Sequence, residues 1–116
     1  MTDMSDTLGP PLTPAVFFTL FALAGGEKHG YAIMQETQKL SDGSFRMGPA
    51  TLYTTLQRLL DLDLVAEAAV DETDSRRRNY RLTKSGRALL DAELGRVEAL
   101  LRRAKAMHWK PAQVKS

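Results

Sequence analysis

The chain lacks cysteine altogether, and it has only two histidines and one tryptophan. Without cysteine it can form no disulfide, no thiolate metal site and no thiol redox sensor, and this composition fits a reducing cytosol. The histidines, His29 and His108, lie far apart without an acidic partner at a metal-ligand spacing. A glycine-rich phosphate loop and a Gly-x-Ser-x-Gly motif are also absent from the sequence. We therefore expect a protein that is not an enzyme and that holds no metal or cofactor.

Long apolar runs are missing as well. The longest one spans residues 14–24, whereas a membrane-spanning helix needs about 20 apolar residues. The residues before this run include Asp3 and Asp6 but no lysine or arginine, which is unlike a secretory signal. The sequence thus predicts a cytoplasmic protein without a membrane partner. Its net charge is only +2, so the distribution of charge along the chain is more informative than the sum.

The apolar run has the features of a first helix. Thr13 and Pro14 supply a hydroxyl cap followed by proline at the first helical position, and Gly25 and Gly26 end the helix. Apolar residues surround its axis, which predicts burial on nearly all sides, in part by a second subunit.

The predicted elements follow in the order helix, helix, helix, two-stranded hairpin and long helix. Periodicity and breaker residues place them at residues 14–24, 29–40, 49–62, 64–70 with 78–82, and 83–107. Three compact helices and a hairpin are the layout of a winged helix-turn-helix. We therefore predict a mainly helical fold with a small β-hairpin. Its parts are a flexible arm (1–12), a winged helix-turn-helix DNA-binding domain (13–83), a C-terminal dimerisation helix (84–109) and a flexible tail (110–116).

The predicted third helix has one apolar face, made by leucines, and one polar face. The polar face holds Ala50, Thr51, Thr54, Gln57, Arg58 and Asp61. Threonine, glutamine and arginine hydrogen-bond to base edges or phosphates. We expect Thr54 and Gln57, at the centre of the face, to read bases, and Thr51 and Tyr53, nearer the flanks, to contact phosphates; Arg58 also faces the DNA. The alternative is a plain solvated face with Tyr53 as a rim aromatic of the core.

Charges of opposite sign are segregated around the predicted hairpin. The charged residues from Asp61 to Asp74 are all acidic, and those from Arg76 to Arg87 are all basic. Arginines in succession on an exposed turn suit a phosphate backbone, which predicts DNA contacts for Arg76, Arg77 and Arg78. The alternative is that the acidic residues of the hairpin neutralise these arginines within the chain.

Apolar residues on the last helix recur at alternating spacings of four and three. The resulting heptad seam consists of Leu90, Leu94, Val97, Leu101 and Ala104. A helix this long presents more apolar surface than a three-helix core can cover, so we predict that a second copy of the chain covers it. Packing back onto the first helix of the same chain is an alternative for one end of the seam.

Three blocks of residues together resemble the PadR family of transcriptional regulators. They are His29-Gly30-Tyr31-Ala32-Ile33, the block Pro49-Ala50-Thr51-Leu52-Tyr53 with Leu56, Arg58 and Leu59, and the stretch from Arg76 to Thr83 with Gly86. The resemblance covers about residues 14–107. It implies a winged helix-turn-helix, a homodimer held largely by the terminal helix, and repression at palindromic operators. It also implies DNA contacts for Thr51 and Tyr53, and it puts Arg76 to Arg78 in or beside the wing.

The sequence departs from the family pattern at two places. The family often has Ser-Pro-Gly before Thr-Leu-Tyr, where this chain has Gly48-Pro49-Ala50, so the operator sequence is left open. Short members that sense flat aromatic ligands can use aromatics in the dimer interface, whereas the middle of this last helix is aliphatic and Trp109 lies beyond the seam. This argues against a drug-binding pore.

The sequence therefore predicts a repressor that acts as a homodimer on double-stranded DNA at a palindromic operator. The alternative function is a winged-helix module that binds a partner protein and not DNA. A small-molecule effector of unknown identity and the choice between repression and activation are left open.

Overall fold

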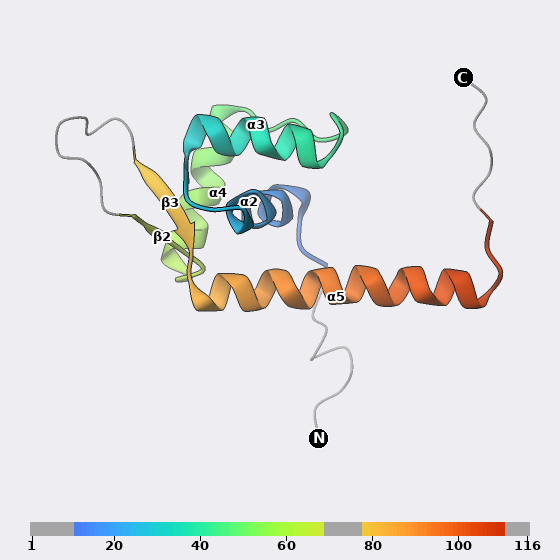
Figure 1. Cartoon of the computed structure of the whole chain (residues 1–116). Coiled ribbons are helices and arrows are strands. Elements are labelled where there is room, and N and C mark those ends of the chain that lie inside the picture. Colours follow the sequence, from blue (N-terminus) through green and yellow to red (C-terminus); the bar gives the residue numbers. More distant parts are fainter. Residues whose placement is uncertain (1–10, 69–77, 111–116) are drawn as a thin grey trace.

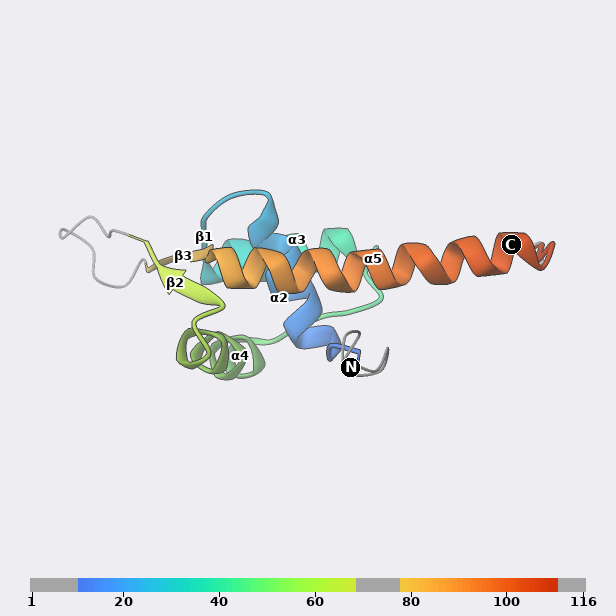
Figure 2. The ribbon, with the colours of Figure 1, turned by 90° about the horizontal axis from the view of Figure 1, so that it is seen from below.

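The computed structural model describes residues 11–68 and 78–110. Their elements are α2 (Pro14–Ala24), β1 (Lys28–His29), α3 (Gly30–Leu40), α4 (Pro49–Asp61), β2 (Val65–Glu67), β3 (Asn79–Leu82) and α5 (Lys84–Ala106). In Figure 1, α2, α3 and α4 form a compact group with the strands at one end, and α5 runs beneath the group. The view from below in Figure 2 shows α5 crossing α2 and continuing well past the helical body. The predicted winged helix-turn-helix fold with a long terminal helix is confirmed, and each helix lies close to its predicted range.

The first helix begins as predicted, and its own chain buries it in part. The Thr13 hydroxyl accepts a hydrogen bond from the Val16 amide at 3.3 Å, and proline follows the cap. Thr19, Leu20, Ala22 and Leu23 are fully buried in α2, whereas the side chains of the N-terminal half, Phe17 and Phe18 included, are partly exposed. The burial that was assigned to a second subunit stays a prediction.

The sheet has three strands in the described part of the chain, in the order β1-β3-β2, and all pairs are antiparallel. The predicted two-stranded hairpin corresponds to β2 and β3, and β1 was missed. Tyr80 lies opposite Lys28 on one side and Glu67 on the other. Strand β1 is two residues long and polar, so it shows no alternation that a pattern could detect. Its pairing nevertheless joins the start of α3 directly to the wing strand β3.

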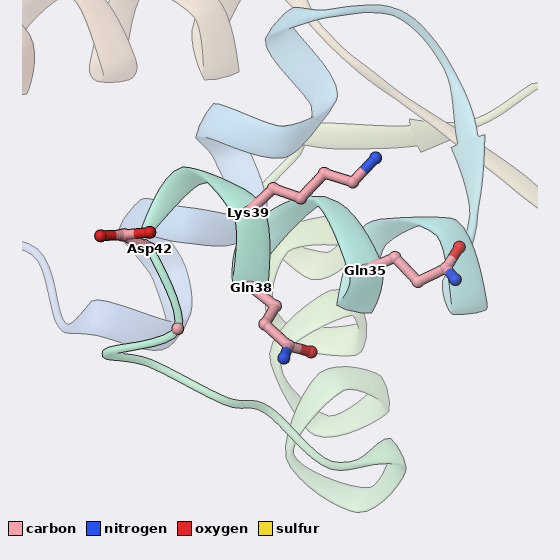
Figure 3. A pocket seen from close by; sticks show the side chains of 5 residues that line it. Gln35, Gln38, Lys39 and Asp42 are labelled. Carbon is pink, nitrogen blue, oxygen red and sulfur yellow. The ribbon is translucent and has the colours of Figure 1, made fainter.

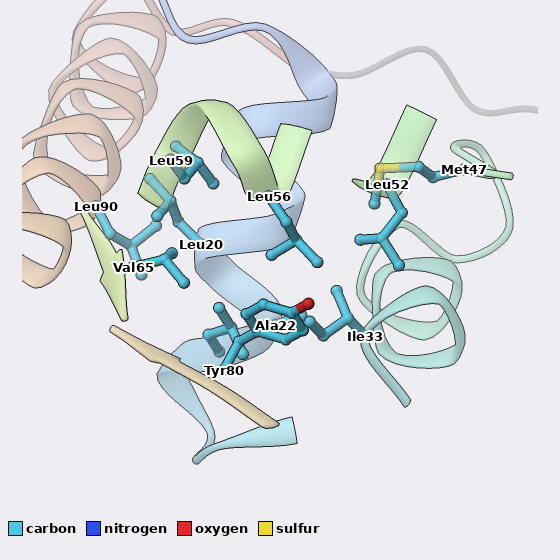
Figure 4. Close-up of a cluster of buried hydrophobic side chains, with 11 residues drawn as sticks. Leu20, Ala22, Ile33, Met47, Leu52, Leu56, Leu59, Val65, Tyr80 and Leu90 are labelled. Atoms are coloured by element: carbon cyan, nitrogen blue, oxygen red, sulfur yellow. The ribbon is translucent and has the colours of Figure 1, made fainter. Parts of the chain in front are cut away.

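The core lies between the three helices, the sheet and the first half of α5 (Figure 4). Its buried members include Leu20, Ile33, Leu52, Leu56, Leu59, Val65, Tyr80 and Leu90. Burial of one such leucine or isoleucine side chain contributes about 1.5–3 kcal/mol. Every helix supplies at least one of these buried residues. The side of each helix that carries them faces the core, so the opposite side is the one that can face outward.

A tight joint attaches α5 to the turn after α4. The Thr83 hydroxyl donates to the Asp63 carbonyl oxygen at 2.7 Å and accepts from the Gly86 amide at 3.0 Å, which caps α5. Gly86 is buried against Leu64, and a Cβ at this position would overlap the Leu64 carbonyl oxygen. Only glycine fits here without a shift of the backbone, which accounts for the Thr-x-x-Gly spacing.

One buried carboxylate holds the segment before α2 against α5. Glu93 is 8% exposed, and it accepts hydrogen bonds from the Arg96 Nε at 2.8 Å, the Arg96 Nη2 at 3.0 Å and the Leu12 amide at 3.1 Å. The hydrogen bonds from Arg96 lower the pKa of Glu93 below its ordinary value, burial opposes this, and the Leu12 amide adds to the lowering. The charged form of Glu93 is therefore the form that the fold favours.

We predict that Gly86→Ala destabilises the protein by about 1–3 kcal/mol or more, because the added Cβ displaces the Leu64 backbone. Gly95→Ala is the matched control in the same helix, since its Cβ would meet nothing within 4 Å. Alanine is the better helix former, so the control should be neutral or stabilising by up to about 1 kcal/mol. Urea unfolding followed by circular dichroism measures both values. Equal midpoints for the two variants would contradict the claim that position 86 has no room for a side chain.

We also predict that Glu93→Gln removes a pH-dependent part of the stability. Because the pKa of Glu93 is lowered in the folded chain, its contribution is present above the unfolded-state pKa and is lost as the pH falls through the folded-state pKa. The variant should be less stable than wild type at neutral pH, and the difference should shrink in acid. Glu98→Gln is the control, since Glu98 is exposed and pairs with an exposed Arg102 at 3.9 Å. A constant difference across the pH range for Glu93→Gln would contradict the role of its charge.

Candidate nucleic-acid interface

Helix α4 buries one face and exposes the other, as its periodicity predicted. Leu52, Thr55, Leu56 and Leu59 are buried. The exposed residues of α4 are Pro49, Ala50, Thr51, Tyr53, Thr54, Gln57, Arg58 and Asp61. A hollow of about 260 Å³ among the small side chains of Ala50, Thr51, Thr54 and Thr55 lies along its first turns. The helix can therefore approach another surface closely along this face.

Tyr53 lies where α3 and α4 meet. Its side chain is half exposed, at 51%, and its hydroxyl lies against Gly30 at the start of α3. A Cβ on Gly30 would be 2.6 Å from that hydroxyl oxygen and 3.3 Å from a methyl group of Leu52. The His-Gly-Tyr and Thr-Leu-Tyr blocks are therefore in contact in the fold. Both blocks were identified from the sequence, but their contact was not, because the residue pattern of one block does not indicate which distant segment packs against it.

Tyr80 of β3 lies close to the same place but is buried. Burial raises the pKa of its hydroxyl above the ordinary value, Glu67 and Tyr53 raise it further, and Arg78 opposes them. Tyr80 is therefore held neutral, and it contributes to the core between the wing and the helices. Tyr53, in contrast, combines a packed ring with an accessible polar end.

Arg78 is the one arginine of the predicted wing cluster that lies within residues 11–68 and 78–110. Its Nη1 is 3.3 Å from the Glu67 Oε1, and both side chains are exposed. For Arg78 the structure thus contains an ion pair within the chain, which is the alternative role considered for it. An exposed pair of this kind contributes about 0–1 kcal/mol, so it can open at little cost. Arg76 and Arg77 lie outside the described residues.

Gln57 and Asp61 are linked on the exposed face of α4. The Gln57 Nε2 donates a hydrogen bond to the Asp61 Oδ1 at 2.9 Å. The spacing of four residues puts both side chains on one face, so the sequence placed them together but did not reveal the bond.

The predicted seam on α5 has two different halves. Leu90 is only 3% exposed and belongs to the core, and Leu94 is partly buried against it. Val97 and Leu101 are 47% and 54% exposed, and Ala104 is partly exposed. The assignment of Leu90 to a dimer interface is therefore corrected, because the first half of α5 packs onto its own chain. The second half leaves the body (Figures 1 and 2), and its large apolar side chains are exposed.

The described residues also line two hollows away from α4. One, of about 270 Å³, lies between α2 and α5 and is lined by Leu12, Pro14, Phe17, Phe18, Glu93, Arg96 and Val97. The other, of about 470 Å³, lies at the end of α3 and is lined by Gln35, Gln38, Lys39, Asp42 and Gly43. The side chains labelled in Figure 3 point in different directions, whereas a small-molecule site needs polar groups that converge. The hollow between α2 and α5 is therefore the better candidate for an effector.

Among residues 11–68 and 78–110, no group of three or more histidine, cysteine, aspartate or glutamate side chains could hold a metal ion. No helix in the same ranges is long and apolar enough to cross a membrane.

Comparison with known proteins finds a family model and several relatives. The model of the family described as "Transcriptional regulator PadR-like family" matches residues 20–92. The chain is 44% identical over 81 residues to the transcriptional regulator Rv3488 of Mycobacterium tuberculosis. The matched region covers 68% of this chain and 71% of that protein. The chain is 40% identical over 79 residues to a 37.1 kDa protein in transposon TN4556 of Streptomyces fradiae, covering 68% of this chain but only 21% of that protein. A third relative is protein X of Lysinibacillus sphaericus, which is 35% identical to this chain over 65 residues. The matched region covers 55% of this chain and 60% of protein X.

Solved structures agree on the fold. The crystal structure of a PadR family transcription regulator from Clostridium difficile R20291 superposes with a TM-score of 0.67 and 20% identity, covering 82% of this chain and 98% of that one. At this identity the likeness concerns the fold alone.

Proposed function

Since the chain belongs to the PadR family of transcriptional regulators, we propose that it represses transcription by binding a palindromic operator as a homodimer. Members of this family regulate transcription and are not enzymes. The observation that carries the DNA-binding part of the proposal is the exposed face of α4, where hydrogen-bonding side chains lie opposite the buried leucines.

The proposed contacts divide into reading and positioning. Thr54 and Gln57 lie at the centre of the exposed face and would reach base edges in the major groove. Thr51 and Tyr53 lie nearer the start and the flank of α4, where contact with a phosphate is the natural role. Arg58 would add a further contact from the same face.

The wing is the second proposed contact. Arg76, Arg77 and Arg78 would bind phosphates without reading sequence. The Arg78–Glu67 pair is compatible with this role, because an exposed pair costs about 0–1 kcal/mol to open.

The proposed dimer uses the second half of α5. Val97, Leu100 and Leu101 are exposed there, and Phe17 and Phe18 of α2 are partly exposed around the hollow that Val97 also lines. A second copy would cover both surfaces at once through a twofold, self-complementary interface. Twofold symmetry of the protein is the reason to expect a palindromic operator.

The proposal also includes a site for a small-molecule effector. The hollow between α2 and α5 adjoins the proposed interface, so a ligand there would touch the surfaces that set the relative orientation of two subunits. Its volume of about 270 Å³ is slightly below the usual range of about 300–1,000 Å³ for ligand pockets. It would admit a small apolar molecule.

The DNA-binding role predicts different effects for Thr54→Ala and Tyr53→Phe. Wild type should enrich one sequence from a pool of random duplexes, and its affinity should fall steeply with salt. Thr54→Ala should change which bases are preferred, by about 1–3 kcal/mol for a lost base contact, whereas Tyr53→Phe should weaken cognate and scrambled DNA by similar factors. Fluorescence anisotropy titrations at fixed salt measure both. Failure of wild type to bind or to select any sequence would leave the protein-interaction alternative.

The proposed dimer predicts that the double variant Val97→Glu, Leu101→Glu is monomeric. Burying either carboxylate in an apolar interface costs several kcal/mol, and neither position belongs to the core of its own chain. Arg103→Glu is the control, because it makes the net charge of α5 more negative by the same amount as the double variant but lies off the apolar seam. Sedimentation velocity should show a monomer for the double variant and a dimer for wild type and control. A folded dimer of the double variant would exclude this interface.

A further inference from the structure

The hydrogen bond between Gln57 and Asp61 determines which way the Gln57 amide points. A carboxylate oxygen only accepts hydrogen bonds, so the NH2 group of Gln57 must be the end that faces Asp61. The carbonyl oxygen of Gln57 therefore points elsewhere, and one of the two amide protons is already used. What the side chain can still offer a ligand is one acceptor and one donor, and the two lie side by side when the N–H anti to the carbonyl oxygen is the one that faces Asp61.

This pattern matches one base in the major groove. Adenine presents an acceptor at N7 beside a donor at N6, whereas guanine presents two acceptors, N7 and O6. The free carbonyl oxygen and the second amide proton of Gln57 complement adenine. Against guanine the carbonyl oxygen would face O6, acceptor against acceptor, and turning the amide over would break the bond to Asp61.

We propose that Asp61 is a positioning residue that orients Gln57 to select adenine over guanine at one position of the DNA site. The inference rests on the proposed DNA-binding function and on the exposure of both side chains on α4. Asp61 need not touch the base, because it acts through the amide of Gln57. Both residues are exposed and outside the core, so their replacement can be tested in a folded chain.

The negative charge of Asp61 has a second consequence. A carboxylate on a DNA-facing surface repels phosphates, so it weakens binding to every sequence. The same residue would then lower affinity for unrelated DNA while it raises discrimination at one base, which is a way to obtain specificity. Removal of the Asp61 side chain should therefore lower the base preference without lowering the affinity for DNA, whereas removal of a side chain that simply contacts DNA would lower both.

The test compares substitutions in the full chain. Wild type is first used to select a preferred duplex from a random pool, and Gln57→Ala identifies the position where preference depends on Gln57. The adenine-to-guanine preference at that position is then measured by anisotropy for Asp61→Ala, Asp61→Asn and both combined with Gln57→Ala. Asp91→Asn on α5 is the control for a change in net charge, since Asp91 is exposed and far along the chain from α4.

Asp61→Ala should reduce the adenine preference about five- to tenfold, which is part of the roughly 5- to 150-fold discrimination expected of one bidentate pair. Binding to scrambled DNA should stay equal or tighten. Asp61→Asn keeps an oxygen that can accept from Gln57, so the preference should stay within about twofold of wild type. In the Gln57→Ala background, Asp61→Ala should change the preference no further.

Three results would overturn the proposal. These are a selected base other than adenine at the Gln57-dependent position, an unchanged preference in Asp61→Ala, and an effect of Asp61→Ala that persists without Gln57. A wild-type protein that selects no sequence would overturn the proposed function as well, whereas normal selection with an unaffected Asp61→Ala variant would overturn only the role of Asp61.

Discussion

The attachment of α5 to the turn after α4 is the constraint on which the arrangement of the molecule depends. Thr83 bonds to the Asp63 carbonyl and caps the helix, and Gly86 lies against the Leu64 backbone with no room for a side chain. The joint directs α5 across α2, so its first half completes the core and its second half leaves the body. Because the joint follows α4 directly, the orientation of α5 is coupled to that of the exposed face of α4.

A second junction connects α3, α4 and the wing. Tyr53 of α4 reaches the start of α3 because Gly30 leaves space for its hydroxyl, and β1, just before α3, pairs with β3 next to the buried Tyr80. These contacts hold the exposed face of α4 and the base of the wing in a fixed relation. The DNA contacts proposed for α4 and for the wing need such a relation, since a phosphate contact and a base contact must be made in one register.

The sequence was informative wherever a short-range pattern decides the outcome. Caps and breakers located the helices, because a helix begins and ends on groups within a few residues of each other. The leucine spacing of α4 indicated its buried face, and the polar face followed from it. Strand β1 was not found, since two polar residues become a strand only when β3 lies beside them. The apolar composition of α2 predicted burial but did not indicate how much of it the same chain supplies, and that chain leaves Phe17 and Phe18 partly exposed.

Local patterns in the sequence, namely periodicity, helix caps and breaker residues, were thus sufficient to derive the helices, the winged fold and the set of side chains on the exposed face of α4. Tertiary structure was required to divide the α5 seam, since Leu90 and Val97 share one helical stripe but only Leu90 reaches the core. It was also required to show that Tyr53 meets Gly30 and that Gln57 bonds to Asp61. The physical reason is the distance along the sequence over which each interaction acts. Helix caps and amphipathic faces arise from interactions between residues close in sequence, whereas burial along a stripe and the direction of a side chain depend on which distant elements lie against it.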